Sequence, residues 1–356
     1  MAKDFYSVPV KEIYRSTNDC VIVSFDIPNE LEQTFSFKQG QYINLKATVK
    51  GEEVIRSYSL CSSPLDKQWS VGIKKIEGGR FSTYANDILK VGDQLEIMPP
   101  DGSFYIDVDP NKKRNYVAFG AGSGITPIVS IIKTHLEKEP HSTFKLFYVN
   151  KNSSSIILKE ELESLKNIYM DRFEIFYFLT REHRNVKLFN GRIDEEKLDI
   201  IFKSICDVNN VDHYFSCGPE AMILLVENFL LEKGVPKTNI HFELFGTVDR
   251  TEEKKQIAKD LQGKQSTITI LEGGKSLDFV METGSNNLLD QAMFSAADLP
   301  YACKGGVCCT CKAKLLEGEV NMLVNYGLEE DEVADGYILT CQAIPVSEKV
   351  VVDFDG

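Results

Sequence analysis

The chain has 356 residues, of which 43% are hydrophobic and 26% are charged, and its 40 basic and 53 acidic side chains give a formal net charge of −13. This length allows two or three domains with substantial cores. The acidic balance argues against nucleic acid or an anionic membrane as the main partner. No stretch approaches the roughly 20 apolar residues of a membrane helix, and the N-terminus lacks the apolar segment of a signal peptide, so we expect a cytoplasmic protein.

The first third of the chain predicts several short strands. Apolar or alternating runs occupy residues 11–27, 40–49, 52–60 and 68–76, and Gly, Asn and Pro residues separate them. This spacing predicts an antiparallel barrel or sandwich over residues 1–109. One helix interrupts the strands, and we expect Ser82 to be its N-cap and Gly92 to stop it.

In the middle third, strand-like and helix-like segments alternate. Buried-looking strands are followed by segments of helical spacing, which predicts βαβ units and a doubly wound parallel sheet over residues 110–246. The predicted strands cover residues 115–122, 144–150, 174–181, 212–219 and 240–246, and the predicted helices cover residues 126–138, 155–166 and 220–234.

A polar, charged segment follows, and we interpret residues 247–264 as a linker. Strand-like runs then return at residues 266–274, 275–282 and 349–355. They predict a small α+β domain over residues 265–356.

Cysteines are concentrated in this last domain. Five of the nine fall in the final 54 residues, and an odd total argues against a disulfide framework. Cys303, Cys308 and Cys311 form a C-x4-C-x2-C motif and Cys341 follows 30 positions later, which is the plant-type spacing for a [2Fe–2S] cluster. The alternative, structural zinc, usually takes two short C-x2-C pairs.

The cluster loop also contains residues that are not expected to be ligands. Gly305 and Gly306 should let the loop curl so that backbone N–H groups point at the sulfurs. Cys309 is not needed for the spacing, and we expect it to be a small filler that points away from the irons.

A glycine loop, Gly120–Gly124, ends one predicted strand and opens a helix, with Thr126 as the expected N-cap and Pro127 as the first helical residue. Exposed amides at a helix N-terminus favour a phosphate, although the G-x-G-x-G form alone also suits a plain tight turn. Cys217 ends another strand, where it could line a ligand crevice or be a buried structural cysteine.

The polar residues that follow two strands bear on the choice of nucleotide. No acidic residue lies where a ribose 2′-hydroxyl partner is expected, whereas Lys151, Ser153 and Arg181 suit a 2′-phosphate. This favours NADPH over NADH. Solvated surface charge is the alternative interpretation of Lys151 and Arg181.

The motifs R-x-Y-S-L at residues 56–60, G-x-G-x-G-I-T-P at residues 120–127 and C-G-P at residues 217–219 resemble, in order and separation, those of the ferredoxin–NADP reductase superfamily. With its plant-type cysteine domain and the segments 78–83 and 325–342, the chain is similar to the reductase subunits of phenylacetyl-CoA epoxidase systems. The resemblance covers residues 6–355.

This resemblance implies a multidomain β, α/β and α+β architecture: an antiparallel FAD-binding β-barrel, a doubly wound NAD(P)-binding domain and a β-grasp-like [2Fe–2S] ferredoxin domain. Arg56 would meet the FAD pyrophosphate, Tyr58 would lie against the flavin ring, and Ser59 would bond near flavin N5. The implied catalytic residues are Ser59, Cys217 and Glu243. The implied cofactor-binding residues are Arg56, Ser57, Tyr58, Ser59, Gly79, Arg80, Phe81, Ser82, Thr83, Gly120, Gly122, Gly124, Thr126, Pro127, Asn150, Ser153, Arg181, Cys217, Gly218, Pro219 and Phe245.

The number of electrons that each cofactor transfers at a time suggests a mechanism. A nicotinamide nucleotide gives up two electrons as hydride, whereas a [2Fe–2S] cluster accepts one, so the flavin must stand between them. The chain would be a reductase for a di-iron oxygenase acting on an aryl-CoA thioester. The alternatives are the reductase of a Rieske ring hydroxylase or steroid hydroxylase, or a redox carrier or sensor with a vestigial flavin domain.

Acidic residues between the third and fourth cluster ligands suggest where a basic patch of the oxygenase would dock, with a solvated acidic face as the alternative. They are Glu317, Glu319, Glu329, Glu330, Asp331, Glu332 and Asp335.

Overall fold

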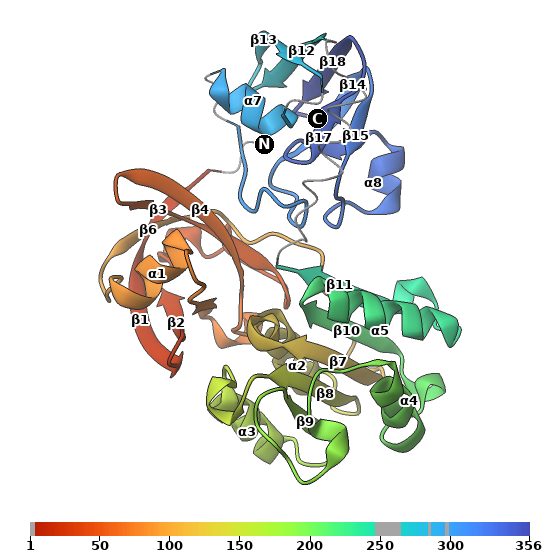
Figure 1. The fold of residues 1–356 in the computed structure, drawn as a ribbon. Helices are drawn as coiled ribbons and strands as arrows, with labels where there is room; N and C mark the ends of the chain where they lie inside the picture. Colours follow the sequence, from red (N-terminus) through yellow and green to blue (C-terminus); the bar gives the residue numbers. More distant parts are fainter. Residues whose placement is uncertain (1–3, 246–264, 284–285, 296–298) are drawn as a thin grey trace. The chain divides into compact units, whose positions relative to one another are not determined.

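The computed structural model describes residues 4–245, 265–283, 286–295 and 299–356. The described chain falls into two compact units, one formed by Phe5–Phe245 and one by the C-terminal residues (Figure 1). No helix within these ranges is both long and apolar enough to cross a membrane.

The first unit begins with a six-stranded antiparallel sheet. Its strand order is β4-β3-β6-β1-β2-β5, and a bridge between Leu60 and Val71 links the two outer strands, which makes the sheet a barrel. Alternate residues such as Val21 and Val23 fill its interior. The strands are β1 (Tyr6–Thr17), β2 (Cys20–Phe25), β3 (Tyr42–Val49), β4 (Glu52–Ser59), β5 (Trp69–Lys74) and β6 (Gln94–Ile97).

The helix inside the barrel segment starts earlier than the sequence suggested. Helix α1 spans Arg80–Asp87 and Gly79 is its N-cap, so the expectation that Ser82 caps it is wrong. The Ser82 hydroxyl instead accepts from the Ile76 amide at 3.3 Å. Gly92 does not stop the helix either, because it lies five residues beyond the end, in a turn where its φ is +90°.

The nucleotide-type domain is a five-stranded parallel sheet of order β11-β10-β7-β8-β9, as the doubly wound prediction required. Its strands are β7 (Asn115–Ala121), β8 (Thr143–Asn150), β9 (Phe173–Leu179), β10 (His213–Gly218) and β11 (Ile240–Leu244). Its helices are α2 (Ile125–Lys138), α3 (Lys159–Ile168), α4 (Glu195–Ser204) and α5 (Glu220–Glu232), and α4 was not predicted.

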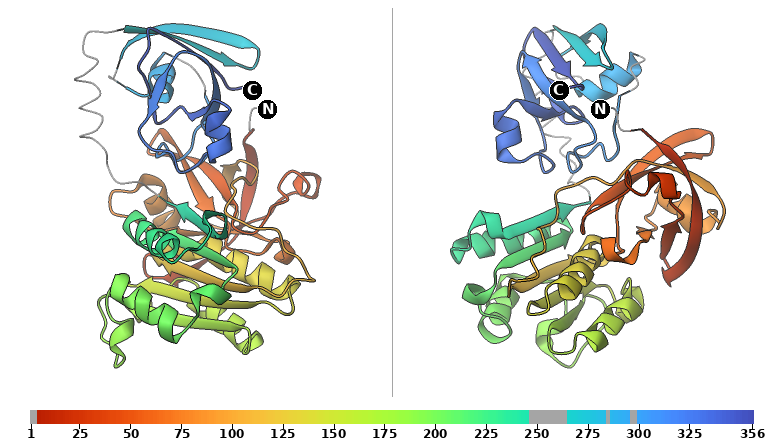
Figure 2. Two further views of the ribbon diagram at one scale, coloured as in Figure 1. Left: turned by 90° about the vertical axis from the view of Figure 1, so that its right-hand side faces the viewer. Right: turned by 180° about the vertical axis from the view of Figure 1, so that it is seen from behind.

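Helices cover both faces of this sheet (Figure 2). On β7, Tyr116 and Ala118 pack with α2 and α3, whereas Val117 and Phe119 pack with α4 and α5. The alternation follows from the two-residue period of a strand, and burial on both faces explains the nearly unbroken apolar runs.

The start of α2 also differs from the prediction. A 3₁₀ turn, Gly122–Gly124, leads directly into α2 at Ile125, with Gly124 as N-cap. Thr126 therefore lies within the first turn rather than at the cap, and Pro127 is not the first helical residue. The Thr126 hydroxyl donates to the Ser123 carbonyl at 3.0 Å.

The barrel and the nucleotide-type domain share one apolar core. Cys20, Ile22, Cys61 and Phe104 of the N-terminal part belong to the same buried cluster as α2, α3 and the strands beneath them. Burying this surface holds the two domains together as one body.

The C-terminal unit is a mixed sheet of order β13-β12-β18-β14-β16, in which β12 and β18 are parallel, with a separate β15–β17 pair. Leu288, Leu289 and Ala292 of α7 pack into its core, as expected of a β-grasp-like domain. The elements are β12 (Gln265–Glu272), β13 (Lys275–Glu282), α7 (Leu288–Phe294), β14 (Lys312–Glu317), β15 (Val320–Met322), α8 (Glu330–Ala334), β16 (Tyr337–Leu339), β17 (Ala343–Pro345) and β18 (Lys349–Asp353). The predicted linker 247–264 lies outside the described residues, and the four predicted domain limits stay predictions.

Candidate functional site

The order of the parallel sheet defines a place for a ligand. The chain builds outward from β7 through β8 and β9 on one side, then returns to build β10 and β11 on the other. Ligands of such sheets bind beyond the carboxyl ends of the strands where this order reverses. The glycine turn Gly122–Gly124 and the strand end Cys217–Gly218 meet there. A Cβ on Gly124 would lie 2.1 Å from the Cys217 carbonyl oxygen, so only glycine fits.

The end of barrel strand β4 reaches the same place. The Ser59 hydroxyl donates to the Glu243 carboxyl at 2.8 Å, across 184 positions of sequence. Glu243 is opposite Cys217 in the register of β10 and β11, and Gly120 is opposite Cys217 on the other side. The structure thus brings together all three predicted catalytic residues, with one glycine-loop residue beside them.

Burial sets the charge of this group. It raises the pKa of Glu243 to about 8, although the Ser59 hydroxyl favours the ionised form. Glu243 is therefore a neutral acid at pH 7, able to hold a proton beside Ser59. Cys217 is fully buried, as in the structural-cysteine alternative, and burial raises the pKa of its thiol, so Cys217 is a neutral thiol.

The residues expected around a flavin lie on β4 and at the start of α1. Arg56 is exposed and Tyr58 half-buried, and they lie two positions apart on one face of the strand. The Tyr58 ring packs on Phe81 of α1 at 5.6 Å, which places the N-terminus of α1 beside β4. Gly79 caps α1 without a side-chain bond, so no cap side chain occupies the first amides of the helix.

Several residues of the predicted flavin set already have partners within the protein. Arg80 forms an ion pair with Glu52, and the Ser57 hydroxyl donates to Asn44 at 2.7 Å. Arg56 donates to the carbonyl oxygen of its neighbour Ile55 at 2.6 Å and keeps further guanidinium donors. Together with the Tyr58 ring and the N-terminus of α1, it provides a cation, an aromatic face and a helix end, which is the combination that suits a flavin dinucleotide.

The strand ends beyond the glycine turn carry the predicted nucleotide contacts. Asn150 ends β8, where both polar atoms of its buried side chain lack a hydrogen bond of normal geometry within the described chain. Arg181 is exposed. Ser153, however, donates both its amide and its hydroxyl to Glu182, at 2.8 Å each. An acidic residue therefore does lie at this edge, contrary to the sequence analysis.

The remaining predicted residues lie at the ends of β10 and β11. Gly218 (φ +158°) ends β10, and Pro219 is the N-cap of α5. Phe245 follows β11 and its side chain is 44% exposed. His213 and His241 form a half-buried pair that shares a hydrogen bond at 3.1 Å.

In the C-terminal unit, the cysteine loop directs amides at sulfur. The Gly305 amide donates to Cys303 at 3.3 Å, and the Gly306 amide bonds to Cys341. Thr310 supplies backbone and side-chain bonds to Cys308. Gly306 has a φ of +72°, and a Cβ there would lie 2.7 Å from the Val324 carbonyl. The predicted role of the two glycines is thus visible in the fold.

The four thiols predicted to be cluster ligands are grouped in two pairs. Cys303 hydrogen-bonds to Cys308, and Cys311 to Cys341. The bond from Cys303 lowers the pKa of Cys308 to about 6. Within the described residues no three His, Cys, Asp or Glu side chains gather around a single metal position. Two thiols for each of two irons is the ligand set of a [2Fe–2S] cluster.

Cys309 lies apart from these pairs. Its thiol donates to the Gly327 carbonyl at 2.7 Å, which ties the cysteine loop to the turn before α8. This is the direction that the filler prediction required.

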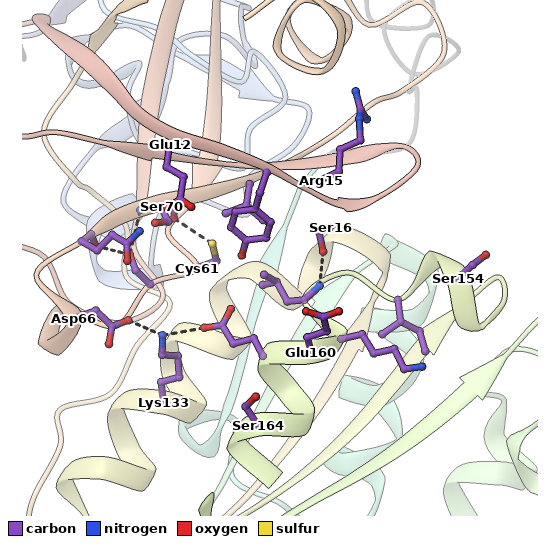
Figure 3. A pocket seen from close by; sticks show the side chains of 18 of the residues that line it. Glu12, Arg15, Ser16, Cys61, Asp66, Ser70, Lys133, Ser154, Glu160 and Ser164 are labelled. Atoms are coloured by element: carbon purple, nitrogen blue, oxygen red, sulfur yellow. Dashed lines mark hydrogen bonds and ion pairs between the residues drawn. The ribbon is translucent and has the colours of Figure 1, made fainter. Parts of the chain in front are cut away.

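A further cavity, of about 720 Å³, lies between the barrel and α3, and it shares only Ser153 with the predicted site residues (Figure 3). Lys133, which lines it, bonds to Asp66 and Glu161. Neither this residue nor Glu182 carried a sequence signal, because their roles depend on contacts between distant segments.

Comparison with known proteins agrees with this geometry. Three family models match in order: an oxidoreductase FAD-binding domain at residues 7–106, an oxidoreductase NAD-binding domain at 119–228, and a 2Fe-2S iron-sulfur cluster binding domain at 270–346. The protein is thus an NAD(P)H-dependent flavin iron–sulfur oxidoreductase with FAD, a [2Fe–2S] cluster and a nicotinamide nucleotide as its cofactors.

Relatives extend over the whole chain. One component of the 1,2-phenylacetyl-CoA epoxidase of Escherichia coli (strain K12) is 41% identical over 351 residues, covering 99% of this chain and 98% of the relative. The ferredoxin reductase component of 3-ketosteroid-9-alpha-monooxygenase from Rhodococcus rhodochrous is 28% identical, covering 97% and 95%. The chain belongs to the family of this epoxidase component.

Solved structures share the fold. Phthalate dioxygenase reductase matches with a TM-score of 0.61 at 21% identity, covering 98% of each chain. An intact type IV self-sufficient cytochrome P450 monooxygenase matches with a TM-score of 0.70 at 19% identity, covering 98% of this chain and 41% of that one.

The thiol pairing makes a direct prediction about cluster content. Cys303→Ala should lose the cluster, because one iron would keep a single protein thiolate. Cys309→Ala should keep it, because Cys309 bonds only to protein groups. Iron analysis and visible spectra of the two purified variants check this. Equal iron content in the two would contradict the ligand assignment.

Proposed function

We propose that this protein passes electrons from NADPH through FAD and its cluster to a di-iron oxygenase that acts on an aryl-CoA thioester, most plainly a phenylacetyl-CoA epoxidase. The observation that carries the proposal is the 41% identity over the full length of an epoxidase component, across all three modules. The ketosteroid relative is 28% identical over a similar length, so a Rieske or steroid hydroxylase partner is less well supported.

Bound flavin supplies the conversion of a hydride into single electrons. The chain's own residues would hold the two ring systems in register. Gly124 leaves room at the Cys217 carbonyl, and Ser59 marks the barrel edge of the same crevice. Arg56 would hold the diphosphate, and Tyr58 would cover one face of the flavin ring.

Arg181 supports NADPH as the donor, because its exposed guanidinium stands beside the strand end where a 2′-phosphate would lie. Glu182 opposes this choice, since its carboxylate occupies the Ser153 amide and hydroxyl. We propose that the guanidinium decides the preference, because Glu182 already has hydrogen-bond donors of its own.

The acidic segment beside the cluster supports a basic partner. Glu332 of α8 pairs with Lys312 at 2.9 Å. Because Lys312 directly follows the predicted ligand Cys311, this ion pair anchors α8 next to the cluster loop. Glu317 is likewise paired, with Lys349 at 2.7 Å. The others are exposed: Glu319, Glu329, Glu330, Asp331 and Asp335. These exposed acids would meet the oxygenase.

The partner assignment can be tested with purified components. Reduced protein should support turnover by a phenylacetyl-CoA epoxidase at a rate far above that of a ketosteroid hydroxylase at equal concentrations. The reverse order would overturn the proposed partner while leaving the reductase chemistry intact.

Neutralising three exposed acids (Glu330→Gln, Asp331→Asn and Asp335→Asn) should slow reduction of the oxygenase about tenfold at low salt and flatten its salt dependence, because steering by unlike charges is lost. Stopped-flow mixing with the oxygenase measures this. The control removes the same charge from α2, α4 and α5 through Glu137→Gln, Glu196→Gln and Glu232→Gln. If both triple variants slow equally, net charge rather than a docking face is responsible.

The pKa of Glu243 predicts the pH dependence of flavin reduction. The value of about 8 lies above the usual value of about 4.3, so Glu243 is neutral at pH 7 and ionises as pH rises through 8. The negative charge on this half-buried side chain would then oppose hydride arrival beside Ser59. The limiting rate of reduction by nucleotide should fall several-fold between pH 7 and pH 9 in the wild type.

Glu243→Gln should remove this fall, because the amide stays neutral and its oxygen still accepts from Ser59. Glu137→Gln, an exposed change on α2, should keep the wild-type profile. An unchanged profile in Glu243→Gln would remove Glu243 from the proposed role.

A further inference from the structure

One face of α2 contacts the barrel through polar groups, and we call these contacts the α2 seam. The seam consists of Thr126, Ser130, Lys133 and Thr134 on α2, which recur at helical spacing, and Ser62, Ser63, Asp66 and Gly72 on the barrel side. Ser130 donates to the Ser62 carbonyl at 2.6 Å, and the Ser63 and Thr134 hydroxyls lie 2.8 Å apart.

The remaining contacts lie at the two ends of the seam. Gly72 of β5 sits so close to Thr126 that an added Cβ would lie 2.6 Å from its methyl group. Toward the other end, Lys133 bonds to Asp66 at 2.5 Å. The helix is therefore held to the barrel from its first turn to its last third.

Lys133 is the charged member of the seam and joins three elements. Its ammonium bonds to Asp66 on the barrel turn (Figure 3). It also bonds to Glu161 of α3 at 2.9 Å. Its side chain is 19% exposed, and those of the two carboxylates are 27% and 30% exposed. Asp66 cannot swing freely, because the same oxygen accepts from the Ser63 amide at 2.9 Å. The turn thus presents a fixed carboxylate to a helix of the other domain.

The apolar core shared by the two domains cannot by itself fix their rotation. Hydrophobic contact is non-directional and rewards closeness rather than one orientation. Hydrogen bonds and ion pairs depend on direction as well as distance. The directed contacts of the seam are therefore the ones suited to setting the angle between barrel and sheet.

A change in this angle would move the glycine turn of the site, because α2 connects the seam to that turn. From Lys133 back to Ile125 is eight residues, or about 12 Å of helix. Ile125 follows the glycine turn that touches the Cys217 carbonyl. A tilt of about 5° over that length moves the turn by about 1 Å relative to Ser59 on the barrel. A misplacement of about 1 Å in a reacting pair can cost about a hundredfold in rate.

We propose that Lys133 is a positioning residue for hydride transfer: by joining Asp66 of the barrel to Glu161 of α3, it fixes the angle at which the nucleotide turn faces the flavin edge. The proposal rests on the reductase chemistry and is independent of the oxygenase partner. Because the ion pairs are partly exposed, their contribution to stability is small, and their effect falls on the reaction geometry.

The test uses the full-length protein loaded with FAD and cluster. Lys133→Met keeps the length of the side chain and removes its charge. Lys145→Met is the matched control, because Lys145 pairs with Glu174 between neighbouring strands of the nucleotide-type domain and does not reach the barrel. Stopped-flow reduction over a range of NADPH concentrations separates the limiting rate of flavin reduction from the nucleotide dissociation constant.

Lys133→Met should lower the limiting rate about tenfold and change the dissociation constant by less than about twofold, with its melting temperature within about 3 °C of the wild type. Lys133→Arg should restore most of the rate, and Lys145→Met should match the wild type. Asp66→Asn removes the charge that links Lys133 to the barrel, and its amide oxygen can still accept from the Ser63 amide, so it should reproduce the loss. Glu161→Gln, which keeps that link, should lose less.

A limiting rate in both Lys133→Met and Asp66→Asn within twofold of the wild type would overturn the proposal. So would a loss that Lys145→Met shares, or one that appears only as a lower melting temperature. The wild-type rate in the same series distinguishes a failure of the Lys133 proposal from a failure of the proposed reductase chemistry. Failure of NADPH to reduce the wild-type flavin would count against the reductase chemistry, not against the role of Lys133.

Discussion

The contact between Ser59 and Glu243 requires two different folds to be held in one orientation. Ser59 ends a barrel strand, and Glu243 lies on the last strand of a parallel sheet. Their 2.8 Å hydrogen bond can form only if the barrel edge meets the point where the strand order reverses. The shared apolar core supplies closeness, and the polar contacts of α2 supply direction. Hydride transfer needs both, because its rate depends steeply on the separation of donor and acceptor.

The titratable side chains beside the Ser59–Glu243 contact are uncharged at neutral pH. Glu243 holds its proton at neutral pH, and the Cys217 thiol is buried and neutral. These strand ends therefore place a hydroxyl group and neutral side chains where we propose that the flavin and the nucleotide would meet. The cluster domain differs in its charge. Backbone amides donate to its cysteine sulfurs, and α8 carries exposed carboxylates. The proposed hydride site is thus neutral, whereas the proposed docking surface of the C-terminal unit is acidic.

Local signals in the sequence predicted most of the architecture. Cysteine spacing, glycine turns at strand ends and apolar periodicity are short-range patterns, and they predicted the cluster ligands, the parallel sheet and the barrel. The R-x-Y-S-L motif predicted a flavin site only through the family resemblance, because an arginine and a tyrosine on one strand do not by themselves indicate a particular ligand. The errors at Ser82 and Thr126 arose because glycines, which lack a side-chain cap signal, start both helices.

The missed features share another cause. Glu182 on Ser153 and Lys133 on Asp66 join segments that are 29 and 67 positions apart. Nothing in the local sequence distinguishes such charges from solvated ones. Their partners appear only when the fold closes, so the positioning of the domains, unlike their identity, could not be predicted.

Rapid anaerobic mixing of the fully loaded protein with NADPH, and separately with NADH, tests the central claim most directly. Flavin absorbance and the paramagnetic signal of the reduced cluster would be followed in time. The account predicts that the flavin bands bleach first, and faster with NADPH. The cluster signal should then rise at a rate that does not depend on protein concentration, because both centres belong to one chain. A cluster reduced before the flavin, or a flavin that neither nucleotide reduces, would contradict it.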